Sequence, residues 1–377
     1  MTLSRPVRAL LVMLIVTVVV AIVATAFGSA VAPTDASARK ANHMASHPLP
    51  SAGEPWDRGA VDALMKGYHK KSGLWPDIKW WSSANALTSL IDYMRATGDR
   101  RYGWVVANTF RQAMDARWGQ FTNQWLDDTG WWALAWIRAY DLTHRARYLR
   151  MARYDTDYMW KYHDNVCGGG VWWSIARTYK DAITNELFIK AAAELHNRIS
   201  GDRRYLRQAL TTWRWFRSSG MINGKHLVED GVDPGSCASN RGTTWSYNQG
   251  VILGGLVDLS RATHDPKFLH QATVLADAST TSSGLNVNGV LTEPCEATGC
   301  DADNPSFKGS YVRNLGELTH ATSSTAFHAY LRRQAQSAHD HDRTPYNQYG
   351  LHWAGPVGRI NTASQLSAVD LMVAALH

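Results

Sequence analysis

The chain has 377 residues, of which 45% are hydrophobic and 19% are charged. This balance excludes a disordered chain, and the length allows one large domain or two ordinary ones. The formal net charge is +7, but Lys and Arg are scattered and no basic stripe alternates with aromatic residues, so we expect no nucleic-acid partner. The 17 tryptophans fit either a large aromatic core or a groove that stacks on sugar rings.

The first segment in chain order is typical of export. Arg5 and Arg8 precede the uncharged apolar run ALLVMLIVTVVVAIVATAF over residues 9–27. A basic start followed by an apolar run indicates a secretory signal, and a run of this length can also span a membrane. Small residues at 36–38 offer a cleavage site, so a cleaved signal peptide and a retained membrane anchor both remain open. Either one predicts a secreted or cell-envelope protein.

The next segment is typical of a linker. Residues 33–55 are rich in Ala, Ser, Pro and His, a composition that favours irregular structure. We therefore expect a signal peptide or signal anchor over residues 1–38, a linker over 39–55 and one catalytic domain over 56–377.

A phrase recurs along this domain, as TGDRRYGWVVA, THRARYLRMA, SGDRRYLRQAL and THDPKFLHQA, with a weaker copy in STAFHAYLRRQA. Each copy combines the end of one helix, a turn with Gly or His and a capping Asp, and the start of another helix. The copies stand 46, 57, 63 and 62 residues apart, a length that holds two helices and a connection. Their aromatic anchors are Tyr102, Tyr148, Tyr205, Phe268 and Tyr330.

Two kinds of helix alternate between these phrases. GWWALAWIRAYDL and WSYNQGVILGGLVDL are apolar nearly all round and therefore predict buried helices, whereas RRYLRQALTTWRWF is amphipathic. About twelve helices fit between Trp56 and His377, and strand signals are few. Six pairs that close into a ring predict an all-α (α/α)6 barrel whose loops form a cleft at one end. An open superhelical solenoid is the alternative.

Two adjacent carboxylates, Asp127 and Asp128, begin one of the inner helices in QWLDDTGWWALAWIRAYDLT. A structural explanation is that Asp128 or Thr129 caps a helix that begins near Gly130. The pair faces the mouth of the ring among tryptophans, however. A helix N-terminus stabilises one ionised carboxylate, and the neighbour then has a raised pKa because it faces that charge and an apolar wall. One ionised and one protonated carboxyl at about 5–5.5 Å suit glycoside cleavage with retention, which makes this a candidate catalytic pair.

Polar and aromatic residues at other inner-helix starts are candidate substrate contacts. CGGGVWWS places three glycines before two tryptophans, so the backbone can approach a ligand and the rings can stack on it. Asn185 and Glu186 interrupt an apolar segment, where a polar residue needs a partner or a function. Ordinary loop, core or capping roles are about equally expected. The candidates are Trp81, Asn85, Trp131, Trp172, Trp173, Asn185, Asp230, Tyr247, Asn248, Gln249, Lys308 and Arg313.

The four cysteines fit an exported protein. Cys295 and Cys300 flank a short Gly-containing loop, so we favour a disulfide there, which leaves Cys167 with Cys237. Free thiols or a metal site are the alternatives, although the spacing lacks the CxxC pair typical of zinc sites. No phosphate loop, nucleophile elbow or HExxH motif is present. We expect no metal and no organic cofactor.

Five motifs, in this order, resemble glycoside hydrolase family 76, the bacterial and fungal endo-α-1,6-mannanases: DDTGWWALAWIRAYDLT, GGGVWWS, AITNELF, WSYNQGVILGGL and FKGSYVRNL. The resemblance covers roughly residues 75–371. It implies an (α/α)6 barrel and a retaining mechanism with Asp127 as nucleophile and Asp128 as acid/base. It also implies a substrate contact at Asp230. Thr129 departs from the family pattern, which more often has an acidic residue there, and we expect this change to adjust the pKa of Asp128.

These observations together predict an exported, retaining endo-α-1,6-mannosidase that acts on α-1,6-mannan or mannooligosaccharides. One alternative is a cell-envelope mannan transglycosylase that uses the same aspartate pair. Another is a non-catalytic mannan-binding protein that keeps only the aromatic groove. A membrane contact is possible through residues 9–27.

Overall fold

The computed structural model describes residues 55–115 and 117–376. These residues form twelve α-helices and four strands of two residues each, as the sequence predicts. The expected signal or anchor over 1–38, including the apolar run 9–27, lies outside the described residues. Within the described ranges, no helix has the length and apolar character needed to cross a membrane.

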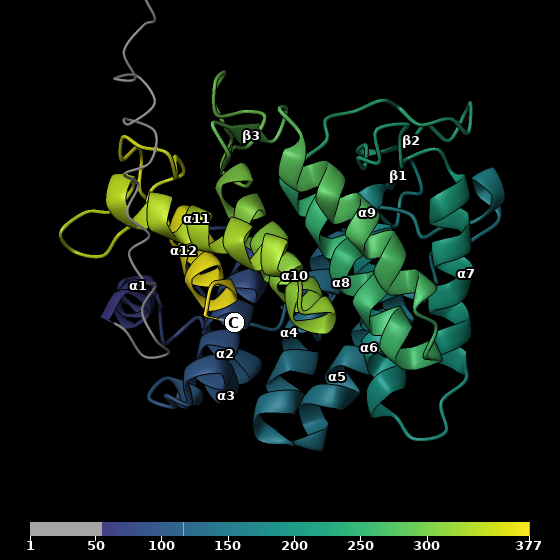
Figure 1. The fold of residues 1–377 in the computed structure, drawn as a ribbon. Helices are drawn as coiled ribbons and strands as arrows, with labels where there is room; N and C mark the ends of the chain where they lie inside the picture. The colour runs from purple at the N-terminus through teal and green to yellow at the C-terminus, as the bar shows by residue number, and fades with distance from the viewer. Residues whose placement is uncertain (1–54, 116, 377) are drawn as a thin grey trace, which may run out of the picture. The chain divides into compact units, whose positions relative to one another are not determined.

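The odd-numbered helices form an outer set and the even-numbered helices an inner set (Figure 1). The outer helices are α1 (Pro55–Lys66), α3 (Gly103–Gln112), α5 (Ala146–Trp160), α7 (Arg204–Ser218), α9 (Lys267–Thr281) and α11 (Thr325–His341). The inner helices are α2 (Trp80–Thr97), α4 (Leu126–Thr143), α6 (Ala182–Arg198), α8 (Ser246–Thr263), α10 (Phe307–Thr322) and α12 (Thr362–Ala374).

The inner helices close into a ring. Each packs on the next, from α2 through α4, α6, α8 and α10 to α12, and α12 packs back on α2. Each outer helix packs on one or two inner helices. The inner set is buried almost throughout; every described residue of α12, for example, is buried. The ring confirms the (α/α)6 barrel and excludes the open solenoid.

The recurring phrases form the turns from inner to outer helices. The inner helices α2, α4 and α8 end before Gly98, His144 and His264, and these residues adopt left-handed backbone conformations with φ of 75°, 53° and 55°. The residue after Gly98 and after His264 is an aspartate, whose side chain accepts a hydrogen bond from a backbone N–H two residues later; Asp265 Oδ1, for example, accepts from the Lys267 N–H at 3.0 Å. The residue after His144 is Arg145, which makes no side-chain capping bond. The sequence signal therefore marks the same turn each time.

Glycines let the inner helices approach closely. A Cβ added at Gly250 of α8 would lie 2.4 Å from Tyr311 Cα of α10, and one at Gly309 of α10 would lie 2.7 Å from Ser367 Cα of α12. Such distances are far below van der Waals contact, so alanine at either position would push the ring apart.

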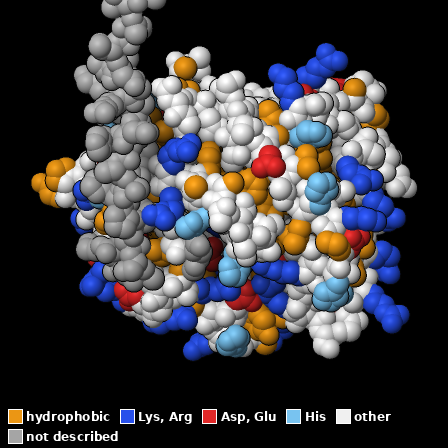
Figure 2. Space-filling view, in the orientation of Figure 1, with side chains coloured by type: hydrophobic (Ala, Val, Ile, Leu, Met, Phe, Trp, Pro, Cys, Tyr) orange, Lys and Arg blue, Asp and Glu red, His pale blue; other side chains and the backbone are white. Residues whose placement is uncertain are grey.

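All six inner helices run in the same direction because each is preceded and followed by an antiparallel outer helix. We call the end where the inner helices begin the upper end, and the end where they finish the lower end. At the upper end, β1 (Lys180–Asp181) pairs antiparallel with β2 (Gly231–Val232), and β3 (Asn286–Val287) pairs with β4 (Val290–Leu291). These short strands belong to the loops at the top of Figure 1. On the face shown in Figure 2, Lys and Arg are scattered among other side chains.

Candidate active site

Cross-links hold the upper-end loops in place. Cys167 and Cys237 form a disulfide that joins the loop before α6 to the loop before α8. Cys295 and Cys300 form a second disulfide in the loop before α10. Both predicted pairings are therefore confirmed, and the upper end has covalently constrained walls.

Asp127 and Asp128 lie in the first turn of α4, at the upper end. The helix begins at Leu126 and its N-cap residue is Trp125, with no side-chain capping hydrogen bond. The prediction that Asp128 or Thr129 is the cap is therefore wrong. The Leu126 backbone N–H instead donates to the Trp173 carbonyl at 2.8 Å. This bond fixes the start of α4 against the loop before α6.

The environment separates the pKa values of the two carboxyls. Burial raises the pKa of Asp127 to about 6, although hydrogen bonds from the Trp173 side chain and from backbone N–H groups at the helix start oppose the rise. Burial also raises the pKa of Asp128 well above its usual value, and the negative charge of Asp127 raises it further. Asp127 is thus the carboxyl that ionises first.

Other acidic and phenolic groups surround Asp127. Asp181, the residue before α6, is 4% exposed, and burial together with the charge of Asp127 raises its pKa well above the usual value. Burial and then the charges of Asp230, Asp181 and Asp127 likewise raise the pKa of Tyr247, in the first turn of α8. Asp230 itself accepts a hydrogen bond from the Tyr179 hydroxyl at 2.6 Å. The side of the site next to Asp127 is therefore strongly acidic.

Asn123 and Lys79 act on Asp128, and Asp303 acts on both carboxyls. The Asn123 side-chain amide donates to Asp128 Oδ2 at 2.6 Å. Lys79, the residue before α2, and Asp303, in the loop before α10, both act electrostatically on Asp128. Their own ion pair joins Lys79 Nζ to Asp303 Oδ2 at 2.5 Å.

Several buried polar atoms around the pair have no hydrogen-bond partner among the described residues. They are Asp127 Oδ1, Asp181 Oδ1, both carboxylate oxygens of Glu186, and both amide atoms of Asn248. Buried polar groups in proteins are normally hydrogen-bonded, so such a group marks a place that water or a ligand satisfies. Sugar hydroxyls, which both donate and accept, suit this mixture of atoms.

Several predicted substrate contacts lie at the upper end near the pair. Trp173 donates to Asp127, and its ring centroid lies 4.5 Å from that of Trp125. Trp81, in the first turn of α2, stacks on Trp131 of α4 with centroids 5.8 Å apart. Tyr247 and Asn248 lie in the first turn of α8, and Asp230 acts electrostatically on Tyr247 and Asp181.

Other predicted contacts serve the loops instead. Asn185 of α6 exchanges two hydrogen bonds with the Val171 backbone, at 2.7 and 3.0 Å. Gln249 of α8 does the same with the Val228 backbone, at 2.8 Å for both bonds. Each amide thus fastens its loop to its helix, and both N–H groups of each amide already donate to backbone carbonyls.

Two buried side chains of the predicted set are also committed to the loops. The Lys308 ammonium is fully buried and donates to Glu296 Oε1 at 2.8 Å and to the carbonyls of Leu291 and Leu351. Trp172 is 4% exposed and donates through Nε1 to Asp164 at 2.6 Å. Both residues shape the site rather than face it in this structure.

The glycine triad has a packing role. Gly168, Gly169 and Gly170 all have positive φ. A Cβ at Gly170 would lie 2.5 Å from the Trp215 ring, and one at Gly169 would lie 2.9 Å from it. The expected ligand approach is therefore replaced by close contact between this loop and α7.

Asn85 and Arg313 lie in the barrel interior. Arg313 of α10 pairs with Asp370 of α12, with Nη2 and Oδ2 at 2.6 Å, and donates to Asn85 Oδ1 at 3.0 Å. Arg313 also lines a cavity at the lower end. The structure therefore does not bring these two residues together with the aspartate pair.

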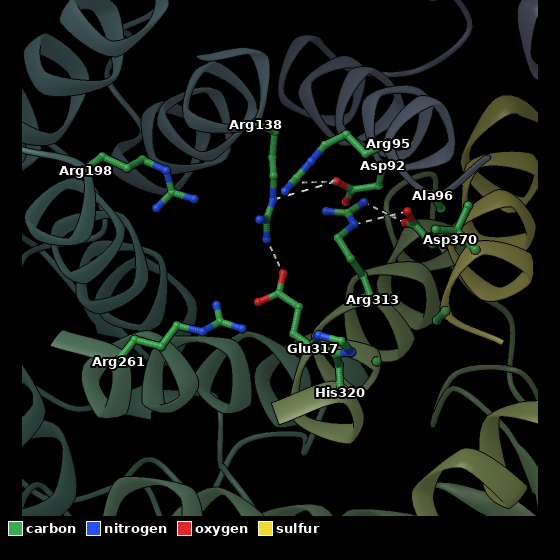
Figure 3. A pocket seen from close by; sticks show the side chains of 13 residues that line it. Asp92, Arg95, Ala96, Arg138, Arg198, Arg261, Arg313, Glu317, His320 and Asp370 are labelled. Atoms are coloured by element: carbon green, nitrogen blue, oxygen red, sulfur yellow. Dashed lines mark hydrogen bonds and ion pairs between the residues drawn. The ribbon is translucent and has the colours of Figure 1, made fainter. Parts of the chain in front are cut away.

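The lower end holds a cavity of about 540 Å³ (Figure 3). Arginines from five successive inner helices reach toward it: Arg95, Arg138, Arg198, Arg261 and Arg313. On α4, Arg138 lies eleven residues beyond Asp127, so about 16 Å of helix separates this cavity from the catalytic candidates.

Carboxylates balance these arginines. Glu194, Asp258 and Glu317 offer oxygens within 4.8 Å of one another, an arrangement that could hold a cation. The Lys190 ammonium already lies there, 3.3, 3.1 and 2.5 Å from them. Arg138 pairs with Glu317 as well. The lower end is thus a network of ion pairs that joins the inner helices.

The sequence analysis missed four polar residues beside the pair: Lys79, Asn123, Asp181 and Asp303. Lys79 and Asp181 are the residues just before the inner helices α2 and α6. The aspartate pair lies in the first turn of another inner helix, α4. A polar residue just before an inner helix was therefore the sequence signal that could have identified Lys79 and Asp181 as neighbours of the pair.

Known proteins share this fold and sequence pattern. The profile of glycosyl hydrolase family 76 matches residues 57–377. The mannan endo-1,6-alpha-mannosidase DCW1 of Saccharomyces cerevisiae is 26% identical over 336 residues, covering 81% of this chain and 74% of its own. The enzyme of the same name from Eremothecium gossypii is 25% identical over 323 residues, covering 78% and 71%.

A solved structure also matches. It is an inactive variant of an alpha-1,6-mannanase of Salegentibacter sp. HEL1_6, with two adjacent aspartates replaced by asparagine, in complex with alpha-1,6-mannotriose. Its TM-score is 0.78 at 23% identity, and the match covers 85% of this chain and 98% of that chain. The fold is therefore shared, and the profile match over most of the sequence establishes that this chain belongs to glycosyl hydrolase family 76.

Proposed function

We propose that this protein is an endo-α-1,6-mannosidase that hydrolyses internal linkages of α-1,6-mannan. The observation that carries the proposal is the pair Asp127 and Asp128, adjacent in the first turn of α4 at the upper end, with burial raising the pKa of both carboxyls and the charge of Asp127 raising that of Asp128 further. The relatives named mannan endo-1,6-alpha-mannosidase and the inactive double-aspartate variant of the Salegentibacter mannanase support the same substrate and the same kind of pair.

The proposed reaction proceeds with retention. Asp127, as the carboxylate, attacks the anomeric carbon of one mannose, while protonated Asp128 gives its proton to the glycosidic oxygen of the leaving chain. A covalent glycosyl ester forms on Asp127. Asp128, now ionised, takes a proton from water, which attacks the same carbon and releases the sugar with its original configuration.

The environment of each carboxyl suits its role. Asp127 has a pKa of about 6, so it is mostly ionised at neutral pH, and the helix start and Trp173 stabilise that form. Asp128 keeps its proton because it is buried and faces the charge of Asp127. This division of two carboxyls into base and acid by their surroundings is what a retaining glycosidase needs.

We further propose that Trp81, Trp131, Trp173, Asp230, Tyr247 and Asn248 contact the substrate. The aromatic rings offer faces on which a sugar packs. Asn248 has an unpartnered donor and an unpartnered acceptor, as a sugar hydroxyl requires. Trp172, Asn185, Gln249, Lys308 and Arg313 are held by protein contacts that must change before they can act on the substrate in the same way. Asn85 has an unpartnered Nδ2, but its Oδ1 accepts from Arg313 in the barrel interior.

We also propose that the enzyme is exported, through a signal peptide or signal anchor over residues 1–38 followed by a linker over 39–55. Two disulfides within the domain support an oxidising compartment. The family match begins at residue 57, immediately after the proposed linker.

Asparagine variants test the assignment. With α-1,6-mannotetraose, Asp127→Asn and Asp128→Asn should each lower kcat by about a thousandfold or more while the thermal unfolding transition remains. Asp277→Asn, on the exposed face of α9, is the matched control and should behave as the parent protein. Unchanged turnover in either of the first two variants would refute the proposed pair.

A further inference from the structure

We infer that Lys79 and Asp303 form the subsite that holds the mannose on the leaving-group side of the scissile bond. The inference rests on the proposed function and adds a site for the part of the mannan chain that departs first.

The two residues come from loops on either side of α12. Lys79 is the N-cap residue of α2, and Asp303 precedes the short helix η2 (Asn304–Ser306) that leads into α10. Their ion pair, at 2.5 Å, spans the start of α12, which lies between α2 and α10 in the ring. The Asp301 side chain holds the Asp303 loop, because its Oδ1 accepts a hydrogen bond from the Asp303 backbone N–H at 2.8 Å.

The position of the ion pair relative to the catalytic pair defines its side. Asp181 precedes α6, on one side of α4 in the ring, whereas Lys79 precedes α2, on the other side. Asn123 binds Asp128 directly, Lys79 acts electrostatically on Asp128, and Asp303 acts on both carboxyls. In a retaining reaction the nucleophile contacts the sugar that stays, and the acid contacts the oxygen of the sugar that leaves. Groups beside Asp128 and away from Asp181 therefore border the leaving sugar.

The ion pair has hydrogen-bonding capacity left for this sugar. The Lys79 side chain is 60% exposed, and one of its three N–H groups is used by Asp303. Asp303 Oδ1 is buried and has no hydrogen-bond partner among the described residues. Together they offer donors and a charged acceptor, and neighbouring hydroxyls of one mannose can bind both.

The same two charges act in opposite directions on Asp128. The charged groups facing Asp128 are Asp127 on its own helix, Asp303 before α10 and Lys79 before α2. The two aspartates favour the protonated acid, and Lys79 favours the carboxylate. Removal of either member of the ion pair therefore has a signed effect on acid catalysis, in addition to its effect on binding.

Substrates with and without a leaving sugar test the inference. One is α-1,6-mannotetraose; the other is a 2,4-dinitrophenyl α-1,6-mannobioside, whose leaving group is not a sugar. Lys79→Met and Asp303→Asn should each lower kcat/KM for the tetraose by about tenfold to a hundredfold more than for the aryl glycoside. Lys79→Arg should recover part of the loss. Lys267→Met, at the exposed start of α9, is the control.

The pH profile supplies a readout that a purely structural role would not move. The basic limb of kcat/KM reports the proton on Asp128. Asp303→Asn removes a negative charge, so this limb should move to lower pH. Lys79→Met removes a positive charge, so the limb should move to higher pH.

The outcomes separate failure of the proposed subsite from failure of the proposed function. If the parent protein cleaves the tetraose but both variants lose activity equally on the two substrates, or lose none, the subsite is refuted and the proposed function stands. Shifts of the basic limb in the same direction would also refute it. If the parent protein does not cleave α-1,6-mannooligosaccharides, the proposed function fails and the subsite fails with it.

Discussion

The two ends of the barrel shift the pKa values of buried carboxyls in different directions, although the same six inner helices build both ends. At the upper end, carboxylate oxygens of Asp127, Asp181 and Glu186 are buried without a hydrogen-bond partner, and burial raises the pKa of all three. At the lower end, burial acts on Glu194 and Glu317 as well, but Arg138 and Lys190 hold their pKa values below the usual range.

The comparison shows what makes a buried carboxylate available for chemistry. Helix N-termini at the upper end favour anions only moderately, so burial decides the pKa there. At the lower end Arg138 and Lys190 lower the pKa of Glu194 and Glu317, whereas burial still raises the pKa of Asp370 although Arg313 pairs with it. Asp258 shows the limit of this rule, because burial raises its pKa to about 6 even though Lys190 opposes the rise. A large cavity lined by charged groups is therefore no sign of catalysis when its charges are already paired.

The largest effect on stability should come from breaking the lower network. Lys190→Met leaves Glu194, Asp258 and Glu317 without their shared cation, so the free energy of unfolding should fall by about 3–5 kcal/mol. Denaturant unfolding of this variant, compared with Lys267→Met on the surface of α9, measures the loss. An unfolding midpoint equal to that of the control would show that the network contributes nothing.

An intermediate effect should come from Glu293, which fastens the upper end of α8. Its buried carboxylate accepts hydrogen bonds from Ser246 N–H at 3.0 Å and Ser246 Oγ at 2.8 Å, and burial raises its pKa to about 7. A raised pKa in the folded state gives stability that is complete below the ordinary value of 4.5 and is lost as the pH rises through 7.

As the pH rises from 4.5 to 8, the free energy of unfolding of Glu293→Gln should therefore increase relative to that of the parent protein, by up to about 3 kcal/mol. Denaturant unfolding at both pH values measures this difference. Identical pH dependence in the two proteins would mean that Glu293 titrates at its ordinary pKa.

The smallest effect should be a gain in stability at the catalytic pair. Asp127→Asn removes a charge whose burial is only partly compensated, so at pH 7.5 the free energy of unfolding should rise by about 1 kcal/mol while activity is lost. The same denaturant measurement checks it, with Asp277→Asn as the exposed control. A less stable Asp127→Asn protein would indicate that the ionised carboxylate is a net stabilising group.

The sequence contained most of the fold because each helix pair repeats the same local signals. Left-handed turns at Gly98, His144 and His264, each followed by a capping aspartate or a basic residue, mark inner-helix ends, and the alternation of apolar and amphipathic segments marks inner and outer helices. Ring closure was also predictable, since six buried helices need partners on both sides. The contact between α12 and α2 supplies the last pair of neighbours and closes the ring.

The site was harder to predict because one residue type serves several purposes at an inner-helix start. Asn185 and Gln249 fasten loops, whereas Asn248, one residue before Gln249, has both amide atoms unpartnered. Sequence pattern does not distinguish them, since the difference lies in which side of the helix faces a loop. The Lys79–Asp303 ion pair joins residues 224 positions apart and has no local signature.

Proton NMR of the first product tests the central claim, the assignment of Asp127 as nucleophile and Asp128 as acid/base, most directly. The protein is mixed with α-1,6-mannotetraose, and the anomeric signals of the new reducing ends are followed before mutarotation. The account predicts that the α-anomer appears first, because two displacements at one carbon restore its configuration. If the β-anomer appears first, water attacks directly and Asp127 is not a nucleophile.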